Sequence, residues 1–135
     1  MGYTDIDHPL TARRLSRLSD EFSGCRAVFT ALGDESRQLI FVELLRHYGG
    51  MRVGELVELV NLSRPTVSHH LRVLREARLV DRYKDGTVNY YHVSSNLELW
   101  QTLVKLSVET EKLASEWNAA LEGGMRRPFR GRKGE

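Results

Sequence analysis

The centre of the chain reads Leu62-Ser63-Arg64-Pro65-Thr66-Val67-Ser68-His69-His70-Leu71-Arg72-Val73-Leu74. Ser63 suits a helix N-cap, and Pro65 suits the first turn, where its missing N–H costs no hydrogen bond. At about 100° per residue, one side of this helix carries Val67, Leu71, Leu74 and Arg78. His69 and Arg72 fall on the opposite side. We therefore expect one face to pack in a core and the other to present hydrogen-bonding groups.

A second, shorter helix is predicted just before this one, from about Val53 to Val60. Its inward face carries Val53, Leu56, Val57 and Val60. Asn61 and Leu62 make the turn between the two helices. This spacing is typical of a helix-turn-helix, in which the second helix enters the DNA major groove.

Two further helical segments precede this pair. From Thr11 to about Phe29, an apolar stripe is formed by Leu15, Leu18, Phe22, Cys25 and Phe29, and Gly24 can divide it into two helices. Asp34 can cap the next helix, from Glu35 to about His47. The core face of that helix is expected to hold Ile40, Phe41, Leu44, Leu45 and Tyr48, and Gly49-Gly50 should end it.

A β-hairpin is predicted after the central helix. Leu79 to Lys84 and Thr87 to Val93 are β-prone runs, separated by Asp85-Gly86, a type I′ turn signal. A helix-turn-helix followed by such a hairpin is a winged helix, so the predicted fold class is mainly α (α+β) with a two-stranded wing. Tyr90 and Tyr91 put one aromatic ring on each face, which leaves the inward face open.

The last helix is predicted from about Asn96 to Leu121. Apolar residues recur in a heptad seam that only Thr110 interrupts. We expect residues 11–29 and 96–121 to form dimerisation helices; the alternative is a terminal helix that packs on its own domain. The expected dimer interface comprises Leu15, Leu18, Phe22, Leu99, Leu103, Leu106, Leu113 and Trp117.

The 135 residues suit one domain, which we place at residues 11–122. We expect residues 1–10 to be a flexible N-terminus and residues 123–135 a basic, disordered tail. No apolar run is long enough to span a membrane and no signal peptide is evident, so a cytoplasmic protein is expected. The single Cys25 excludes a disulfide within the chain.

Positive charge is concentrated in two places. Residues 63–92 contain six Lys and Arg against three acidic residues, and residues 125–135 contain five against one, although the whole chain carries only +2. This asymmetry favours a polyanionic partner near the central helix and the tail. Ordinary solvated charge is the alternative for the central patch, and for the tail the alternative is a solubilising end.

Enzymatic function is not expected. The sequence has no Gly-rich phosphate loop, no nucleophile elbow and no metal-ligand spacing, so we predict no cofactor and no bound metal. The competing function is that of a winged helix used as a protein-interaction module. Such a surface would more often present aromatic or aliphatic anchors than Ser68, His69 and Arg72.

About half of the chain resembles the ArsR/SmtB family of winged-helix bacterial repressors. The resemblance is carried by Ala31-Leu32-Gly33-Asp34-Glu35-Ser36-Arg37, by residues 62–77, and by the Asp85-Gly86 hairpin that ends in Tyr90-Tyr91-His92-Val93. It implies a homodimer whose two central helices enter successive major grooves of a partly palindromic operator. It also implies repression that an effector relieves.

The DNA-binding residues follow from helix geometry and from the family's recognition-helix positions. The side chains expected to contact base edges are Ser63, Thr66, Ser68 and His69. Arg64 and Arg72 are expected to add contacts to guanine or phosphate. The backbone phosphates or the minor groove are expected to face Arg82, Lys84 and Thr87 on the wing.

The sequence departs from the metal-sensing members of the family at the residues that would bind the effector. Their Cys-x-Cys positions correspond to Arg52 and Gly54, and no histidine follows His92 to supply their second metal site. Two alternatives stay open: an N-terminal metal site at Asp5, Asp7 and His8, and an intersubunit thiol at Cys25. An unknown small-molecule effector is the remaining partner that the resemblance implies.

Overall fold

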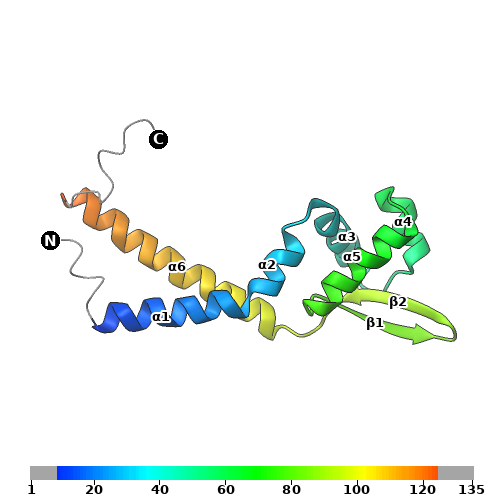
Figure 1. Ribbon diagram of the computed structural model, residues 1–135, viewed down its shortest axis with the longest axis horizontal. Coiled ribbons are helices and arrows are strands. Elements are labelled where there is room, and N and C mark those ends of the chain that lie inside the picture. The colour runs from blue at the N-terminus through cyan, green and yellow to red at the C-terminus, as the bar shows by residue number, and fades with distance from the viewer. Residues whose placement is uncertain (1–8, 125–135) are drawn as a thin grey trace. The chain divides into compact units, whose positions relative to one another are not determined.

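The computed structural model describes residues 9–124 (Figure 1). The elements in chain order are α1 (Pro9–Gly24), α2 (Arg26–Leu32), α3 (Glu35–Arg46), α4 (Val53–Val60), α5 (Arg64–Glu76), β1 (Val80–Asp85), β2 (Val88–Val93) and α6 (Glu98–Glu122). This order confirms the mainly helical class with a two-stranded wing. Helix α1 begins at Pro9, two residues before the expected start at Thr11, and the expected N-terminal segment and basic tail fall largely on residues 1–8 and 125–135, which lie outside the described range.

The described chain divides into two compact units. The winged-helix unit spans residues 25–98, and the helical pair comprises residues 9–24 and 99–124. Each unit is defined by its own contacts, so the expected single domain over residues 11–122 stays a prediction.

The core of the winged-helix unit lies where α3 contacts α2, α4, α5 and β2. Side chains with no more than 2% exposed surface come from α2, α3, α4, α5, the residue before β1 and the start of β1: Val28, Ile40, Leu44, Leu56, Val67, Leu71, Leu74, Leu79 and Val80. Each such side chain contributes about 1.5–3 kcal/mol by leaving water. Cys25, which is part of the predicted apolar stripe, is also fully buried. It occupies the break between α1 and α2 that was expected near Gly24.

Helix α3 begins and ends for local reasons. The Asp34 carboxylate accepts the backbone N–H of Arg37 at 3.0 Å, which confirms the predicted cap and lowers the pKa of Asp34. Two residues predicted in the core are exposed instead: Leu45 at 52% and Tyr48 at 91%. Leu45 lies about 100° around the helix from Leu44, at the edge of the packed arc, and Tyr48 follows the end of the helix.

The wing is an antiparallel pair whose register includes Val80↔Val93, Arg82↔Tyr91 and Lys84↔Asn89. The turn residues are Gly86 and Thr87, one position later than predicted. Only Gly86 has a positive φ, of 64°, so the turn follows the II′ pattern rather than the expected I′. Met51 pairs with Tyr91 through two backbone hydrogen bonds of 2.8 Å, which attach β2 to the segment before α4.

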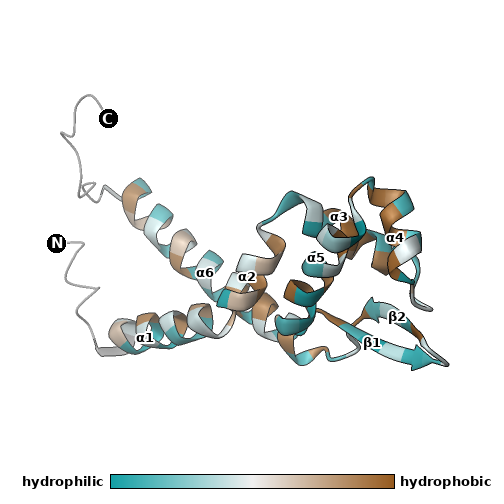
Figure 2. Cartoon of the chain, turned by 45° about the vertical axis from the view of Figure 1, so that its right-hand side comes forward, coloured by the Kyte–Doolittle hydropathy of each residue, from teal (hydrophilic) through white to brown (hydrophobic). Residues whose placement is uncertain are grey.

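Arg14 connects the two helices of the helical pair. Arg14 donates from Nε to Glu109 Oε1 at 3.1 Å and from Nη2 to Glu116 Oε2 at 2.6 Å, so it ties α1 to α6. Among the described residues of this unit only Leu106 is buried. Figure 2 shows hydrophobic and hydrophilic bands alternating along both helices. No helix within residues 9–124 is long and apolar enough to cross a membrane.

Candidate nucleic-acid interface

The turn between α4 and α5 is fixed by two local features. Asn61 adopts the left-handed conformation, with φ of 54°, and its N–H donates to the Val57 carbonyl at 3.2 Å. Ser63 then caps α5, because its Oγ accepts the Thr66 N–H at 3.3 Å and its hydroxyl donates to Thr66 Oγ1 at 2.8 Å. The predicted helix-turn-helix is confirmed, and two predicted site residues are held together at the start of α5.

The two faces of α5 differ as the sequence predicted. Val67, Leu71 and Leu74 have no exposed surface, whereas Arg64, His69 and Arg72 are exposed. Thr66 and Ser68 are half-buried on the flanks. The packing position predicted for Arg78 is wrong, because α5 ends at Glu76 and Arg78 follows it, exposed, with φ of 62°.

His70 belongs to the inner face of α5, beside buried Leu71. Its side chain is 9% exposed, and its Nδ1 lies 3.2 Å from Nη1 of Arg37 on α3. Burial lowers the pKa of His70 below its ordinary value. Of the two adjacent histidines, His69 is therefore the one that faces outward.

The strand register settles which face of the wing packs. Opposite residues in an antiparallel pair share a face, and Val80 and Tyr91 are buried. Arg82, opposite Tyr91, and Lys84, opposite Asn89, continue that face toward the exposed tip. The other face carries Tyr83 and Tyr90, whose rings stack with centroids 5.3 Å apart.

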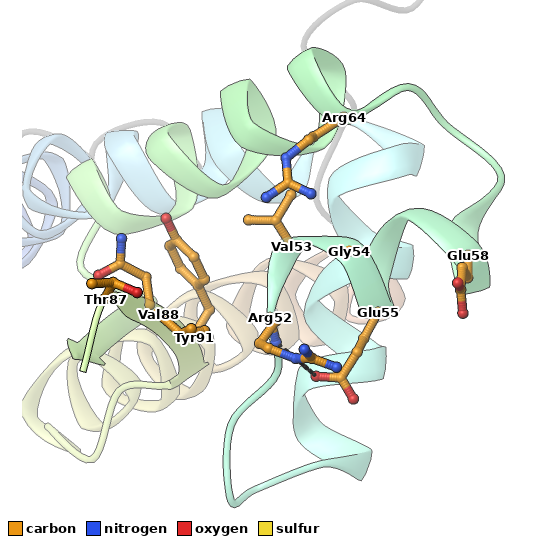
Figure 3. Close-up of a pocket in the computed structure, with 10 residues that line it drawn as sticks. Arg52, Val53, Gly54, Glu55, Glu58, Arg64, Thr87, Val88 and Tyr91 are labelled. Atoms are coloured by element: carbon orange, nitrogen blue, oxygen red, sulfur yellow. Dashed lines mark hydrogen bonds and ion pairs between the residues drawn. The ribbon is translucent and has the colours of Figure 1, made fainter. Parts of the chain in front are cut away.

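A groove of about 460 Å³ lies between α4, the start of α5 and β2 (Figure 3). Arg64 and Thr87, predicted separately on α5 and the wing, both line it. The Arg64 side chain points toward Val53 and Gly54 (Figure 3), and its Nη1 lies 3.8 Å from the position that a Cβ on Gly54 would occupy. The groove brings the recognition helix, the wing and the start of α4 together.

The two arginines that line the groove differ in whether a carboxylate neutralises them. Arg52 donates to Glu55 Oε1 from its backbone N–H at 3.0 Å and from Nε at 3.2 Å, and these hydrogen bonds lower the pKa of Glu55. Glu55 is therefore ionised at neutral pH and compensates Arg52. The Glu58 carboxylate points away from Arg64 (Figure 3).

The predicted cations lack such compensation. Within residues 9–124, no acidic group lies within 4 Å of the basic groups of Arg64, Arg72, Arg82 or Lys84. They come from α5 and from the core-facing side of the wing. Side chains of this kind can take phosphate oxygens without first breaking an ion pair.

The predicted residues do not all meet at one place. Arg72 lines a separate hollow of about 280 Å³ with Arg75, Glu76, Val80 and Asp81. Sequence reasoning missed Arg52 and Asn89 as groove residues. Asn89 could have been predicted, because it lies opposite Lys84 in the hairpin. Arg52 could not, because its place in the groove depends on how α4 packs beside the wing.

Two positions at the start of α4 correspond to the Cys-x-Cys pair of the metal-sensing relatives. Arg52 is the exposed N-cap of α4 and Gly54 lies in its first turn, so these two positions offer no metal-ligand side chain. Across the described range no three His, Cys, Asp or Glu side chains gather closely enough to hold a metal ion. The candidate cluster of Asp5, Asp7 and His8 lies outside that range.

The residues predicted for a dimer interface differ in exposure. Leu15 and Phe22 on α1 are exposed at 39% and 44%, and Leu106 on α6 is buried at 3%. The others are half-buried: Leu18, Leu99, Leu103, Leu113 and Trp117. The single chain thus already covers Leu106, and the interface as a whole stays a prediction.

The helix-turn-helix, the exposed polar face of α5 and the wing together define a winged-helix DNA-binding protein. Residues 34–82 match the family model described as bacterial regulatory protein, arsR family. The chain is 34% identical to an uncharacterized HTH-type transcriptional regulator of Methanocaldococcus jannaschii, over 55% of this chain and 82% of that protein. It therefore belongs to the ArsR family and is a DNA-binding transcriptional regulator rather than an enzyme.

Two further similarities agree with this assignment. The chain is 34% identical to the transcriptional repressor SdpR of Bacillus subtilis, over 52% of this chain and 76% of that protein. The crystal structure of NolR from Sinorhizobium fredii matches with a TM-score of 0.53 and 31% identity, over 66% of this chain and 86% of that one.

Proposed function

We propose that the chain is a homodimeric repressor that binds an inverted-repeat operator in double-stranded DNA. The observation that carries the proposal is the set of uncompensated cations on α5 and the wing, next to exposed His69. In this arrangement α5 enters the major groove, where Ser68, His69 and Arg72 meet base edges. Arg82, Lys84 and Thr87 take backbone phosphates beside it.

Repression is supported by similarity to proteins named as repressors, including SdpR and the arsenical resistance operon repressor of Escherichia coli. A homodimer is supported by the exposed apolar residues of α1, which a second copy of the chain would cover. A dimer with twofold symmetry would also match the twofold symmetry of an inverted repeat. A regulator of chromosomal DNA would act in the cytoplasm, which we include in the proposal.

We also propose that a small-molecule effector releases the operator. The Cys-x-Cys positions of metal-sensing members are Arg52 and Gly54 here, so no thiolate metal site can form at these two positions. Addition of Zn²⁺, Cd²⁺ or arsenite to the protein–DNA complex is expected to leave the complex intact. Release by one of these ions would contradict this part of the proposal.

Selection of DNA from a random duplex pool tests the main proposal. The purified full chain should enrich one inverted repeat with half-sites about 10 base pairs apart, bound by two chains of 15.5 kDa. Arg72→Ala should weaken binding to the enriched duplex by roughly 5- to 100-fold while changing non-specific binding little. The matched control is Arg46→Ala, which removes an exposed arginine of α3.

The wing gives a second signature. Arg82→Ala and Lys84→Ala should each reduce the salt dependence of binding by about one counterion and weaken all sequences alike. Enrichment of no sequence, together with equal behaviour of Arg72→Ala and Arg46→Ala, would overturn the proposed operator recognition.

A further inference from the structure

Arg37 forms a network that DNA contact does not explain. Its Nε donates to the Ala31 carbonyl at 2.8 Å, its Nη2 to the Thr30 carbonyl at 3.4 Å, and its Nη1 contacts His70 Nδ1 at 3.2 Å. Ala31 and Thr30 belong to the end of α2, Arg37 to α3 and His70 to α5. One side chain therefore connects three helices of the winged-helix unit.

The contact with His70 defines a protonation state. A guanidinium group has donors only, so Nδ1 must supply a lone pair, and the neutral ring carries its proton on Nε2. Protonation of Nδ1 would remove this hydrogen bond and place two cations about 3 Å apart. The charged groups that act on the ring are Asp34, which favours protonation, and Arg37 and His69, which oppose it.

The Arg37–His70 hydrogen bond lies close to the residues proposed to contact DNA bases. It lies beside His69 and two residues from Ser68 and Arg72, the proposed base-reading residues. The rest of the inner face of α5 is made of buried Val67, Leu71 and Leu74. Apolar packing is non-directional, whereas a hydrogen bond weakens steeply as its angle changes. The Arg37 bond can therefore fix the rotation of α5 about its axis.

We propose that Arg37 is a positioning residue for the recognition helix, and that it orients α5 through His70 only while His70 is neutral. This inference rests on the proposed operator binding. It assigns a role in DNA reading to a side chain on α3 that need not touch DNA. The ratio of operator binding to non-specific binding is its measurable consequence.

Arg37→Met tests the bond while keeping much of the side-chain stem. At neutral pH this variant should lose roughly tenfold in the ratio of operator to non-specific affinity, using the duplex selected as above. Arg46→Met is the matched control, an exposed arginine on the same helix, and should keep the ratio. Circular dichroism at the assay temperature would check that both variants are folded. An unchanged ratio in folded Arg37→Met overturns the proposal.

The dependence of the binding ratio on pH distinguishes a role of Arg37 in orienting α5 from a role in stabilising the fold alone. As the pH falls below about 6.5, the wild-type ratio should decrease toward the roughly tenfold lower ratio of Arg37→Met as His70 gains a proton. In Arg37→Met the ratio should be low and should vary less with pH than in the wild type, because no bond to His70 remains to be broken and only His69 on α5 can still respond. His70→Asn places an amide oxygen near the position of Nδ1 and cannot titrate, so it should keep a high ratio that varies with pH no more than that of Arg37→Met. A flat wild-type profile, or the same slope in His70→Asn, would contradict the proposed role.

A measurement without DNA keeps the two proposals distinguishable. The ¹⁵N shifts of the His70 ring in the free full chain should show a neutral ring protonated on Nε2 at neutral pH, and Arg37→Met should change them. A ring protonated on Nδ1 would overturn the positioning role even if operator binding holds. Failure of the selection experiment, with the expected ring state present, would instead count against operator binding.

Discussion

The winged-helix unit and the helical pair differ in how much apolar surface each buries by itself. Residues 25–98 hold nearly all of the buried side chains, whereas in the described part of the helical pair only Leu106 is buried. Exposed apolar residues of the pair include Leu15, Phe22, Val104 and Val108. The comparison teaches that the unit proposed to read DNA is stabilised by its own core, while α1 and α6 retain apolar surface that a second copy can cover.

The largest effect is expected from Leu71→Ala in the core of the winged-helix unit. Leu71 has no exposed surface, so its truncation should lower the free energy of unfolding by about 2–5 kcal/mol. Val104→Ala on α6, where the side chain is 62% exposed in the single chain, should cost less than about 0.5 kcal/mol when both variants are unfolded at a concentration that keeps the chain monomeric. Urea unfolding measures both losses. Comparable losses would contradict the conclusion that the winged-helix unit holds most of the stabilising core.

The next effect concerns the helical pair and its proposed partner copy. Leu15→Lys places a charge on the exposed stripe of α1 and should weaken the dimer by about 1.5–3 kcal/mol, with the helix content of the monomer retained. Ser16→Lys adds the same charge at the neighbouring exposed position and is the control. Sedimentation equilibrium measures the dissociation constant. Equal constants for the two variants would remove Leu15 from the interface.

A smaller effect is expected where the wing meets the loop after α3. Gly50 has φ of 103°, and a Cβ there would lie 3.2 Å from Tyr90 Cβ and 3.3 Å from Tyr83 Cε1. Gly50→Ala should therefore cost about 1–2 kcal/mol of stability, because the backbone is left-handed and the space is filled. Gly49→Ala meets nothing within 4 Å and is the control. Thermal unfolding of both variants would sharpen the link between this loop and the wing.

The same comparison explains which features could be predicted from the sequence. The caps at Asp34 and Ser63 depend on residues three positions away, so local chemistry was sufficient to find them. The buried and exposed faces of α5 followed from helical periodicity for the same reason. Extrapolation failed where the helices end, at Tyr48 and Arg78, because the period stops with the last hydrogen-bonded turn.

Features that depend on distant residues could not be predicted. The wing turn shifted by one residue, since Asp-Gly and Gly-Thr both offer a glycine and the register is decided elsewhere. Pairing of Met51 with Tyr91 and burial of Val80 fix that register. The groove of Arg52, Arg64 and Asn89 likewise needs three separate elements in place. Neither arrangement leaves a local signal in the sequence.

The smallest effect expected is a loss of stability in mild acid, and it should come from the winged-helix unit. His70 has a pKa below its ordinary 6.5 in the folded chain, chiefly because it is buried. The unfolded chain therefore binds a proton at this residue more readily, and stability should fall as pH drops below about 6.5. The loss should be small, and His70→Asn should remove this component. Urea unfolding at several pH values, with His47→Asn as the exposed-histidine control, measures it. If the His70→Asn profile matched that of the wild type, the acid sensitivity would have to come from the carboxylates and not from the His70 contact that joins α5 to α3.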